Sequence, residues 1–332
     1  MMSGDLEALA RRCVEAASRA EAWMLRHLAD QAVIGSDLAD PVRYYKWPLA
    51  LHWRGRDDEA LRLLGWIAHR CLTEAGDFAS PRTGFHQGFH SYANLWLVWA
   101  AAELGGSRLT KQTLQFLVKH RNRDRGGVPT NPTDPSRPYE DPLSTSFLGI
   151  VACALRQQVL ARECLRYLSA LFDKQPDPTR FWLRTLRDGS LVTEVPQGAD
   201  ATTWVVDLGK REQCYYFFGA MCYSLARYLE VFGADEGATR LPERISHLLE
   251  EVGHEALSSI WAAKVAPGCV ALYSATGEDR YLRLARPVIE AVLAGQVAEG
   301  YWLKDGKPWL TVSAEQCAWL TDIVRRLEGE DR

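Results

Sequence analysis

The chain has 332 residues, of which 47% are hydrophobic and 24% charged, and it carries a formal net charge of −3 at pH 7. These values are ordinary for a globular protein, and they favour neither nucleic acid nor an anionic membrane surface as a partner. The first ten residues include Asp5 and Glu7 and contain no apolar core, so we expect no signal peptide. No apolar run approaches the ~20 residues that a membrane-spanning helix needs.

Cysteine usage indicates a reducing compartment. The eight cysteines are scattered along the chain, and no two of them form a CxxC pair. Their simplest interpretation is buried free thiols. Since no Pro/Ser-rich linker or run of like charges divides the chain, we expect a single cytoplasmic domain that covers residues 1–332.

Two kinds of helical segment alternate along the chain. The first, residues 5–32, has one apolar stripe, whereas the second, residues 42–53, is apolar on nearly all sides. Asp40 and Pro41 predict the start of the second segment as an N-cap and a first-turn proline. The later one-striped segments are residues 58–72, 110–121, 160–172, 243–252 and 279–293. The later apolar segments are residues 91–104, 142–155, 212–232 and 257–275 (with a kink expected at Pro267-Gly268), and residues 313–327 close the series.

The connections alternate as well. Short ones follow Gly55, Gly105, Gln157, Gly233 and Gly277, and long, polar and aromatic ones follow the intervening helices. A helix that is apolar all round must be surrounded by protein, whereas a helix with one stripe lies outside. The pattern therefore predicts an all-α fold, an (α/α)6 toroid of about twelve helices, with the long loops gathered on one face.

Two long loops break the helical period. Residues 181–195 and residues 301–312 each place an Asp-Gly pair, Asp188-Gly189 and Asp305-Gly306, between runs rich in apolar and aromatic residues. This pattern predicts a β-hairpin with a tight turn in each loop. We expect both hairpins to form walls above the opening of the toroid.

Three phrases of the sequence resemble units of known α/α toroids. Residues 271–293 (ALYSATGEDRYLRLARPVIEAVL) and residues 222–235 (CYSLARYLEVFGAD) are similar to the helix-turn-helix units of six-hairpin glycosidase-like proteins. Residues 73–106 resemble a unit of either that group or the terpenoid cyclase and prenyltransferase-like toroids. The resemblance implies a toroid across nearly the whole chain. It departs from the cyclases, because residues 199–203 (ADATT) keep only Asp200 of a DxDD motif and the DDxxD and QW motifs are missing.

The predicted site lies where the long loops lead into the apolar helices, because free N–H groups at helix N-termini favour anionic or oxygen-rich ligands. The candidate catalytic residues are Glu140, Asp141, Asp207, Glu212, His86 and His90. The candidate substrate-binding residues are Tyr44, Lys46, Trp47, Tyr92, Lys210, Tyr215, Trp302, Trp309 and Glu315. No motif in the sequence requires a metal or another cofactor.

Each candidate group has a structural alternative. Glu140-Asp141 before Pro142 is either an acidic helix start or half of a carboxylate pair, which would need a separation of ~5–5.5 Å for retention or ~6.5–9.5 Å for inversion. Its candidate partners are Asp207, Glu212 and Glu315. Residues 207–213 are either a solvated turn or a binding site in which Lys210 or Arg211 holds a substrate anion while Asp207 or Glu212 serves as the base.

The histidines and aromatic residues also allow two interpretations. His86 and His90 flank Gly88, which argues against the regular helix of a zinc motif, so they are ordinary loop histidines or general acid–base groups. The loop-face aromatic residues could stack on sugar rings or stabilise a carbocation.

Three functions are consistent with these sequence features. The first is a carbohydrate-active hydrolase, lyase or epimerase that uses carboxylate or histidine acid–base chemistry. The second is a terpenoid cyclase or isomerase with an aromatic cavity. The third is a non-catalytic binding toroid, for which all loop-face carboxylates would be capped or salt-bridged. The expected partner is a small-molecule substrate, and the oligomeric state is left open.

Overall fold

The computed structural model describes residues 4–30, 41–79 and 88–329. Contacts between Cα atoms divide the chain into two compact units. Unit 1 comprises Met1–Gly84, Trp96–Phe116 and Val292–Arg332, and unit 2 comprises Phe85–Leu95 and Leu117–Ala291. The prediction of a single domain stays a prediction. Within the described residues, no helix combines the length and the apolar character that a membrane crossing requires.

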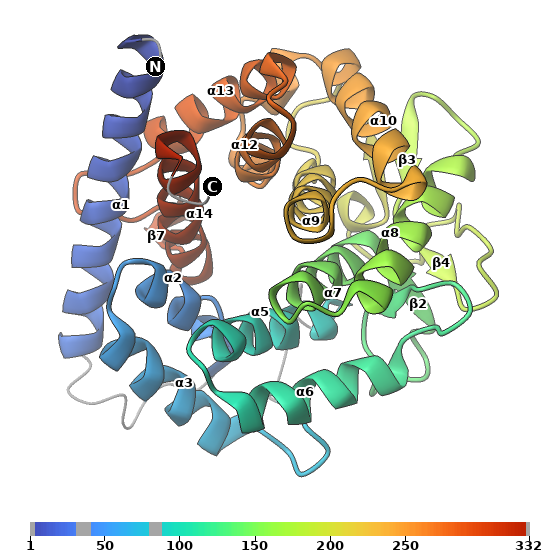
Figure 1. Cartoon of the computed structure of the whole chain (residues 1–332), viewed down its shortest axis with the longest axis horizontal. Helices are drawn as coiled ribbons and strands as arrows, with labels where there is room; N and C mark the ends of the chain where they lie inside the picture. Colours follow the sequence, from blue (N-terminus) through green and yellow to red (C-terminus); the bar gives the residue numbers. More distant parts are fainter. Residues whose placement is uncertain (1–3, 31–40, 80–87, 330–332) are drawn as a thin grey trace. The chain divides into compact units, whose positions relative to one another are not determined.

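Unit 1 is built from helices at both ends of the chain (Figure 1). Helix α1 packs against α14, α14 packs against α2, and α2 packs against α3. Their bounds are α1 (Gly4–Asp30), α2 (Trp47–Trp53), α3 (Asp57–Cys71) and α14 (Leu310–Glu328), with the 3-10 helix η1 (Pro41–Tyr44) before α2. Helices α5 (His90–Glu103) and α6 (Ser107–His120) have residues in both units.

The expected helix over residues 42–53 is divided into η1 and α2. Pro48 lies in the first turn of α2, where its missing N–H is tolerated, whereas it would interrupt a helix that continued from residue 42. The hairpin expected around Asp305-Gly306 is confirmed, because β6 (Leu303–Lys304) pairs with β7 (Lys307–Pro308).

Unit 2 is built from helices of the middle of the chain. Helix α7 packs against α8 and α9, α9 packs against α12, and α10 packs against α8 and α9. The helices of unit 2 are α7 (Pro142–Ala154), α8 (Gln158–Asp173), α9 (Tyr216–Phe232), α10 (Glu236–Val252), α11 (His254–Leu257), α12 (Val265–Thr276) and α13 (Asp279–Ala294), and the last three residues of α13 belong to unit 1.

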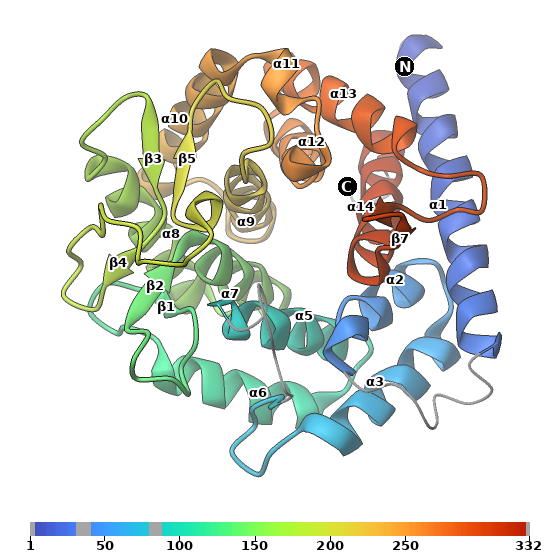
Figure 2. The same cartoon turned by 180° about the vertical axis from the view of Figure 1, so that it is seen from behind.

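Two small sheets are formed by the segments of unit 2 that lead into α7 and α9 (Figure 2). An antiparallel sheet has the strand order β1-β2-β4, and β3 pairs with β5. The strands are β1 (Val128–Pro129), β2 (Tyr139–Asp141), β3 (Arg180–Trp182), β4 (Thr185–Leu186) and β5 (Val205–Asp207).

The hairpin predicted over residues 181–195 is confirmed close to its turn, where Thr185 and Leu191 form an antiparallel bridge. The tight turn is present, since the N–H of Leu186 donates to the carbonyl of Ser190 at 2.9 Å. Farther from the turn the pairing differs from the prediction, because β3 pairs with β5, and β4 also pairs with β2. An alternating apolar pattern predicts a strand but not its partner, because pairing depends on which faces become buried in the tertiary structure.

The apolar segment 257–275 is also not one helix. It divides into α11, the 3-10 helix η3 (Ile260–Ala262) and α12. The hydroxyl of Ser259 accepts a hydrogen bond from the N–H of Trp261 and so starts a new turn. Pro267 consequently lies in the first turn of α12 and causes no kink there.

The predicted alternation of buried and one-sided helices is confirmed. All twelve residues from Pro142 to Cys153 in α7 are buried, whereas α8 exposes Arg162 and Arg166. Helices α9 and α12 approach especially closely at Gly219. A Cβ atom at that position would lie 2.1 Å from the carbonyl carbon of Lys264. This contact fixes the start of α12 against the first turns of α9.

We expect Gly219→Ala to lower the free energy of unfolding by about 1–3 kcal/mol, because the added methyl overpacks the contact with Lys264. The matched control is Gly65→Ala in α3, where an added Cβ meets no atom within 4 Å. This control should be stabilising by about 0.5–1 kcal/mol, since alanine is the better helix former. Urea unfolding measures both, and equal changes in the two variants would contradict the expected overpacking.

Candidate functional site: a buried cation cluster in unit 2

Strands β2 and β4 separate two polar layers in unit 2. Glu140 is the register partner of Thr185, and their chain neighbours are Asp141 and Arg184. Because successive side chains of a strand point to opposite faces, Glu140 and Thr185 share one face and Asp141 and Arg184 share the other. Adjacent residues of the sequence therefore enter different environments.

Asp141 caps helix α7. Its Oδ1 atom accepts a hydrogen bond from the N–H of Ser144 at 2.8 Å, and its Oδ2 atom lies 3.6 Å from Nη1 of Arg184. Burial raises the pKa of Asp141, against the opposing effects of Arg184 and of the hydrogen bonds at the helix start. Of the two interpretations of this residue, the acidic helix start is what the structure places here, together with an ion pair.

The side chain of Arg184 is a buried cation in unit 2. It is only 3% exposed, and its guanidinium lies over the rings of Phe89, at 4.3 Å, and Trp204, at 5.4 Å. Burial lowers its pKa, and Asp141 opposes that shift. Its Nε and Nη1 atoms have no hydrogen-bond partner among the residues that the structure describes. Because unsatisfied buried donors are costly, this side chain is suited to receive an anionic group.

A second buried cation lies at the start of α12. Lys264 is 7% exposed, and its Nζ atom lies 4.6 Å from the ring centre of Tyr216 and 5.6 Å from that of Tyr92. Tyr216 also interacts electrostatically with Arg184. We name these residues the unit 2 cluster: Phe89, Tyr92, Asp141, Arg184, Trp204, Tyr216 and Lys264.

Of the predicted site residues, Asp141 and Tyr92 belong to the unit 2 cluster. His90 is buried at the start of α5, two residues before Tyr92. His86 lies outside the described residues. Glu140 is 1% exposed and lies on the opposite face of β2, where its Oε1 atom accepts a hydrogen bond from Nδ2 of Asn122 at 2.9 Å.

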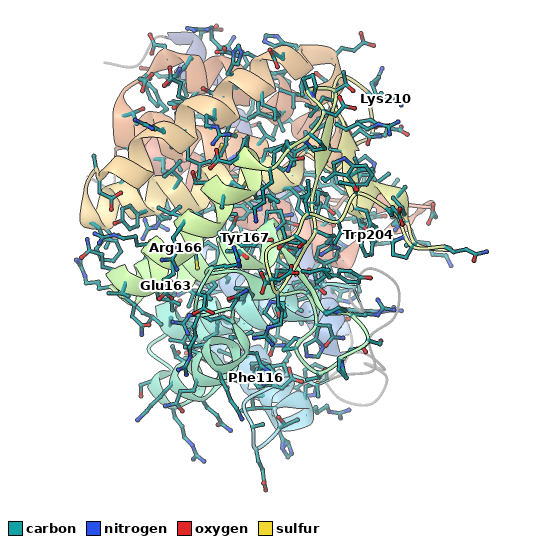
Figure 3. The ribbon with its side chains drawn as sticks, turned by 90° about the vertical axis from the view of Figure 1, so that its right-hand side faces the viewer. Phe116, Glu163, Arg166, Tyr167, Trp204 and Lys210 are labelled. Carbon is teal, nitrogen blue, oxygen red and sulfur yellow. The ribbon has the colours of Figure 1, made fainter. Side chains whose placement is uncertain are left out.

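The predicted residues of the 207–213 loop lie near the surface. Asp207 pairs with Lys210 at 2.8 Å and with Arg180 at 3.2 Å. The hydroxyl of Tyr215 donates to the carbonyl of Lys210 at 2.7 Å. Lys210 and Glu212 are exposed, and Figure 3 labels Lys210 and Trp204 in the loop that leads into α9. Of the two interpretations of this loop, the arrangement corresponds to the solvated turn.

Unit 1 brings two predicted residues into direct contact. Lys46 forms a buried ion pair with Glu315, and Nζ of Lys46 lies 5.2 Å from the ring centre of Tyr45 and 5.6 Å from that of Trp96. The second oxygen of Glu315 accepts a hydrogen bond from Nε1 of Trp319 at 3.1 Å. These contacts join the starts of α2 and α14.

The other predicted aromatic residues of unit 1 have structural contacts. The hydroxyl oxygen of Tyr44 lies 3.1 Å from Nε2 of His27, and Nε1 of Trp47 donates a hydrogen bond to the carbonyl of Leu310. Trp302 is buried and donates to the carbonyl of Val292. Trp309 is half-buried, with the ammonium of Lys304 at 5.1 Å from its ring centre.

Within the described ranges, no group of three His, Cys, Asp or Glu residues could hold a metal ion.

Sequence reasoning did not single out Arg184, Lys264, Trp204 and Tyr216, which belong to the unit 2 cluster. A usable signal was present, since both cations interrupt otherwise uncharged stretches, FWLRTL and IWAAKVAPG. A lone charge in an apolar segment is rarely buried without a partner or a function.

We compared the sequence and the structure of the chain with those of known proteins. No described protein family and no characterised protein matches the chain by sequence. Solved structures do match it. A GH76 α-mannanase from Bacteroides thetaiotaomicron is similar over 86% of this chain and 84% of its own, with a TM-score of 0.58 at 13% identity. The chain has an α/α-toroid fold.

Two further structures extend the likeness. The cellobiose 2-epimerase from Spirochaeta thermophila gives a TM-score of 0.54 at 17% identity, over 88% of this chain and 86% of its own. A type II terpene cyclase from Scytonema gives 0.52 at 11% identity, over 96% of this chain and 99% of its own. The toroid therefore resembles both groups to which its sequence phrases are similar, and the predicted fold class is confirmed. At these identities the likeness extends to the fold alone.

Glu140→Gln should stabilise the protein increasingly as the pH rises. Burial raises the pKa of Glu140, with the hydrogen bond from Asn122 opposing the shift. The folded state therefore favours the neutral carboxyl. The wild type loses stability as the pH rises from the pKa of the unfolded state, about 4.3, through the higher pKa of the folded state. A glutamine stays neutral and still accepts from Asn122. Unfolding measured from acid to neutral pH tests this, and a gain that does not grow with pH would refute it. Glu194→Gln, at an exposed position, is the control and should show no such trend.

Lys46→Met should lower the free energy of unfolding by about 3–5 kcal/mol, because it removes the cation that pairs with the buried carboxylate of Glu315. Adding Glu315→Gln should restore most of that loss, since the glutamine is neutral and its oxygen can still accept from Trp319. Chemical denaturation of both variants measures the difference. A double variant as unstable as the single one would show that the pair's charge is not what matters.

Proposed function

We propose that the chain is a carbohydrate-active enzyme that uses acid–base chemistry on a sugar bearing a carboxylate, as a lyase or an epimerase does. The observation that supports this most is the buried guanidinium of Arg184, which has donors left over for an anion. Planar guanidinium groups bind carboxylates through two parallel hydrogen bonds. Bound in this way, a sugar carboxylate would lie beside the unit 2 cluster.

The chemistry follows from the charges. A carboxylate that is neutralised by a guanidinium withdraws electrons from the neighbouring C–H bond, which makes that proton easier to remove. Tyr216 is the proposed base, because its ring lies beside both cations of the cluster: the ammonium of Lys264 is 4.6 Å from the ring centre, and Arg184 interacts with it electrostatically. Aromatic faces such as Trp204 are suited to stack on the sugar ring.

A two-carboxylate hydrolysis is less well supported. Three of the five candidate acids have structural roles: Asp141 caps α7, Asp207 pairs with two cations, and Glu315 pairs with Lys46. These three roles favour a non-catalytic binding toroid, which is the second candidate function. Such a toroid would bind the same acidic sugar through Arg184 without turning it over.

A terpenoid cyclase is also less well supported. Its carbocation intermediates need free aromatic faces, and the faces of Phe89, Trp204 and Tyr216 are already occupied by Arg184 and Lys264. A carbocation placed there would meet two like charges. The α-mannanase and the cellobiose 2-epimerase act on carbohydrates, as their names state, and this supports the choice of substrate class.

The test is a screen of uronic acids and uronate-containing oligosaccharides for elimination or epimerisation, followed by variants. We expect Arg184→Gln and Tyr216→Phe each to lower kcat/KM by about 10²–10³-fold, with Tyr216→Phe acting mainly on kcat. Arg180→Gln, an exposed arginine of the neighbouring strand that pairs with Asp207, is the control and should leave turnover unchanged.

Three other outcomes are informative. Binding of acidic sugars that requires Arg184 but is never followed by turnover would identify a binding toroid. Efficient turnover of neutral sugars by the Arg184→Gln variant would overturn the proposed substrate class. Wild-type activity in Tyr216→Phe would remove that residue as the base.

A further inference from the structure

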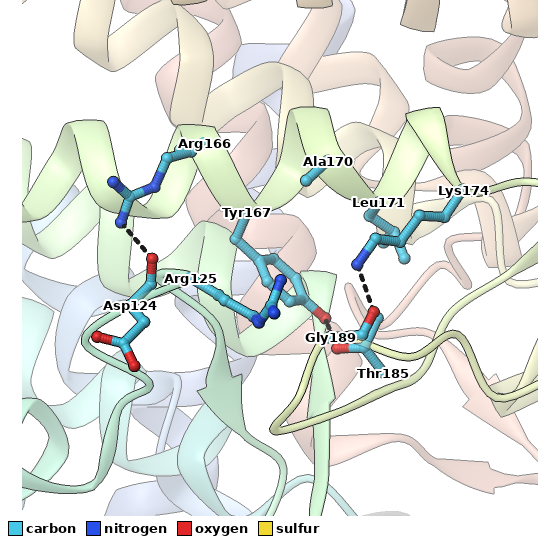
Figure 4. A pocket seen from close by; sticks show the side chains of 9 residues that line it. All are labelled: Asp124, Arg125, Arg166, Tyr167, Ala170, Leu171, Lys174, Thr185 and Gly189. Atoms are coloured by element: carbon cyan, nitrogen blue, oxygen red, sulfur yellow. Dashed lines mark hydrogen bonds between the residues drawn. The ribbon is translucent and has the colours of Figure 1, made fainter.

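A separate cavity lies on the other face of the β2–β4 pair. It has a volume of about 150 Å³ and lies between helix α8, the segment after α6 and the turn that follows β4 (Figure 4). Thr185 borders this cavity, whereas its chain neighbour Arg184 points to the unit 2 cluster. All the residues that line the cavity belong to unit 2.

The walls of this cavity are positively charged. Arg125, Arg166 and Lys174 line it, with Asp124 as the one carboxylate. Among the described residues, none of the three cations forms an ion pair. Arg166 donates to the backbone carbonyl of Asp124 at 3.0 Å, and Lys174 donates to that of Gly189. These carbonyls hold the side chains in place without neutralising their charge.

The turn after β4 is shaped to accommodate Arg125. Gly189 has a positive φ of 84°, and a Cβ atom there would lie 2.7 Å from Nη1 of Arg125. Any side chain at this position would push the guanidinium aside. The neighbouring carboxylate of Asp188 does not line the cavity; it accepts a hydrogen bond from the N–H of Ser190 at 2.8 Å and interacts electrostatically with Arg125 and Lys174.

The floor of the cavity is polar and uncharged. The hydroxyl of Tyr167 lies 3.1 Å from Oγ1 of Thr185, and both residues are buried. Desolvation by burial raises the pKa of Tyr167 well above its usual value, which keeps the phenol protonated and able to donate. The cavity thus combines cationic walls with hydroxyl groups below them.

We propose that this cavity binds a phosphoryl-type oxyanion, either inorganic phosphate or the phosphate group of a small metabolite. Two guanidinium groups and an ammonium around a small hollow match the charge and the several acceptor oxygens of a tetrahedral phosphate. The site is distinct from the unit 2 cluster and does not rest on the proposed enzymatic function.

The experiment is calorimetric titration of the full chain with inorganic phosphate and, separately, with glycerol phosphate, at constant ionic strength. Arg125→Gln and Arg166→Gln should each weaken binding about tenfold, as expected for the loss of one charge-assisted contact. Arg123→Gln, at an exposed position two residues before Arg125, is the matched control and should change affinity less than about twofold. Lys174→Met provides a third variant if either arginine variant fails to fold.

The outcomes distinguish the source of the ligand. Binding of both probes supports a phosphoryl site in general, and binding of one alone identifies free phosphate or a phosphate ester as its ligand. Absence of saturable binding to both probes, equal affinity for acetate, or equal weakening by Arg123→Gln would overturn the proposal.

Discussion

The interaction between Asp141 and Arg184 is the constraint on which the polar interior of unit 2 depends. One oxygen of Asp141 caps α7 and the other faces the buried guanidinium. A guanidinium in this position without a counter-charge would cost several kcal/mol. Because the cap fixes the carboxylate at the first turn of the helix, it also fixes the place where Arg184 can be buried between Phe89 and Trp204. The charge of the site is thereby tied to the start of a helix.

The second cation is positioned by backbone packing. Gly219 allows α9 to touch the carbonyl group of Lys264, and Tyr216 lies three residues earlier on α9, within one turn. The same contact that joins α9 to α12 therefore brings the ammonium over the Tyr216 ring. Helix packing and the electrostatics of the candidate site are two consequences of one close approach.

The thin β2–β4 pair lets one short segment serve two environments. Glu140 and Thr185 face the layer that contains Asn122 and Tyr167, whereas Asp141 and Arg184 face the aromatic cluster. The two carboxylates of Glu140-Asp141 cannot work as a local pair, because strand geometry directs them apart. Their difference in role is a property of the strand and not of the residue type.

The sequence by itself determined the features that depend on neighbours in the chain. The alternation of buried and one-sided helices, the turn at Asp305-Gly306 and the cap before Pro142 all follow from periodicity and from local backbone preference. Only the tertiary structure decided that β3 pairs with β5, that residues 257–275 divide into separate helices, and that Arg184 and Lys264 both lie close to Tyr216. The physical reason is that burial of a charge depends on which distant surfaces meet. Local patterns encode the shape of each element, whereas its partners are selected by packing.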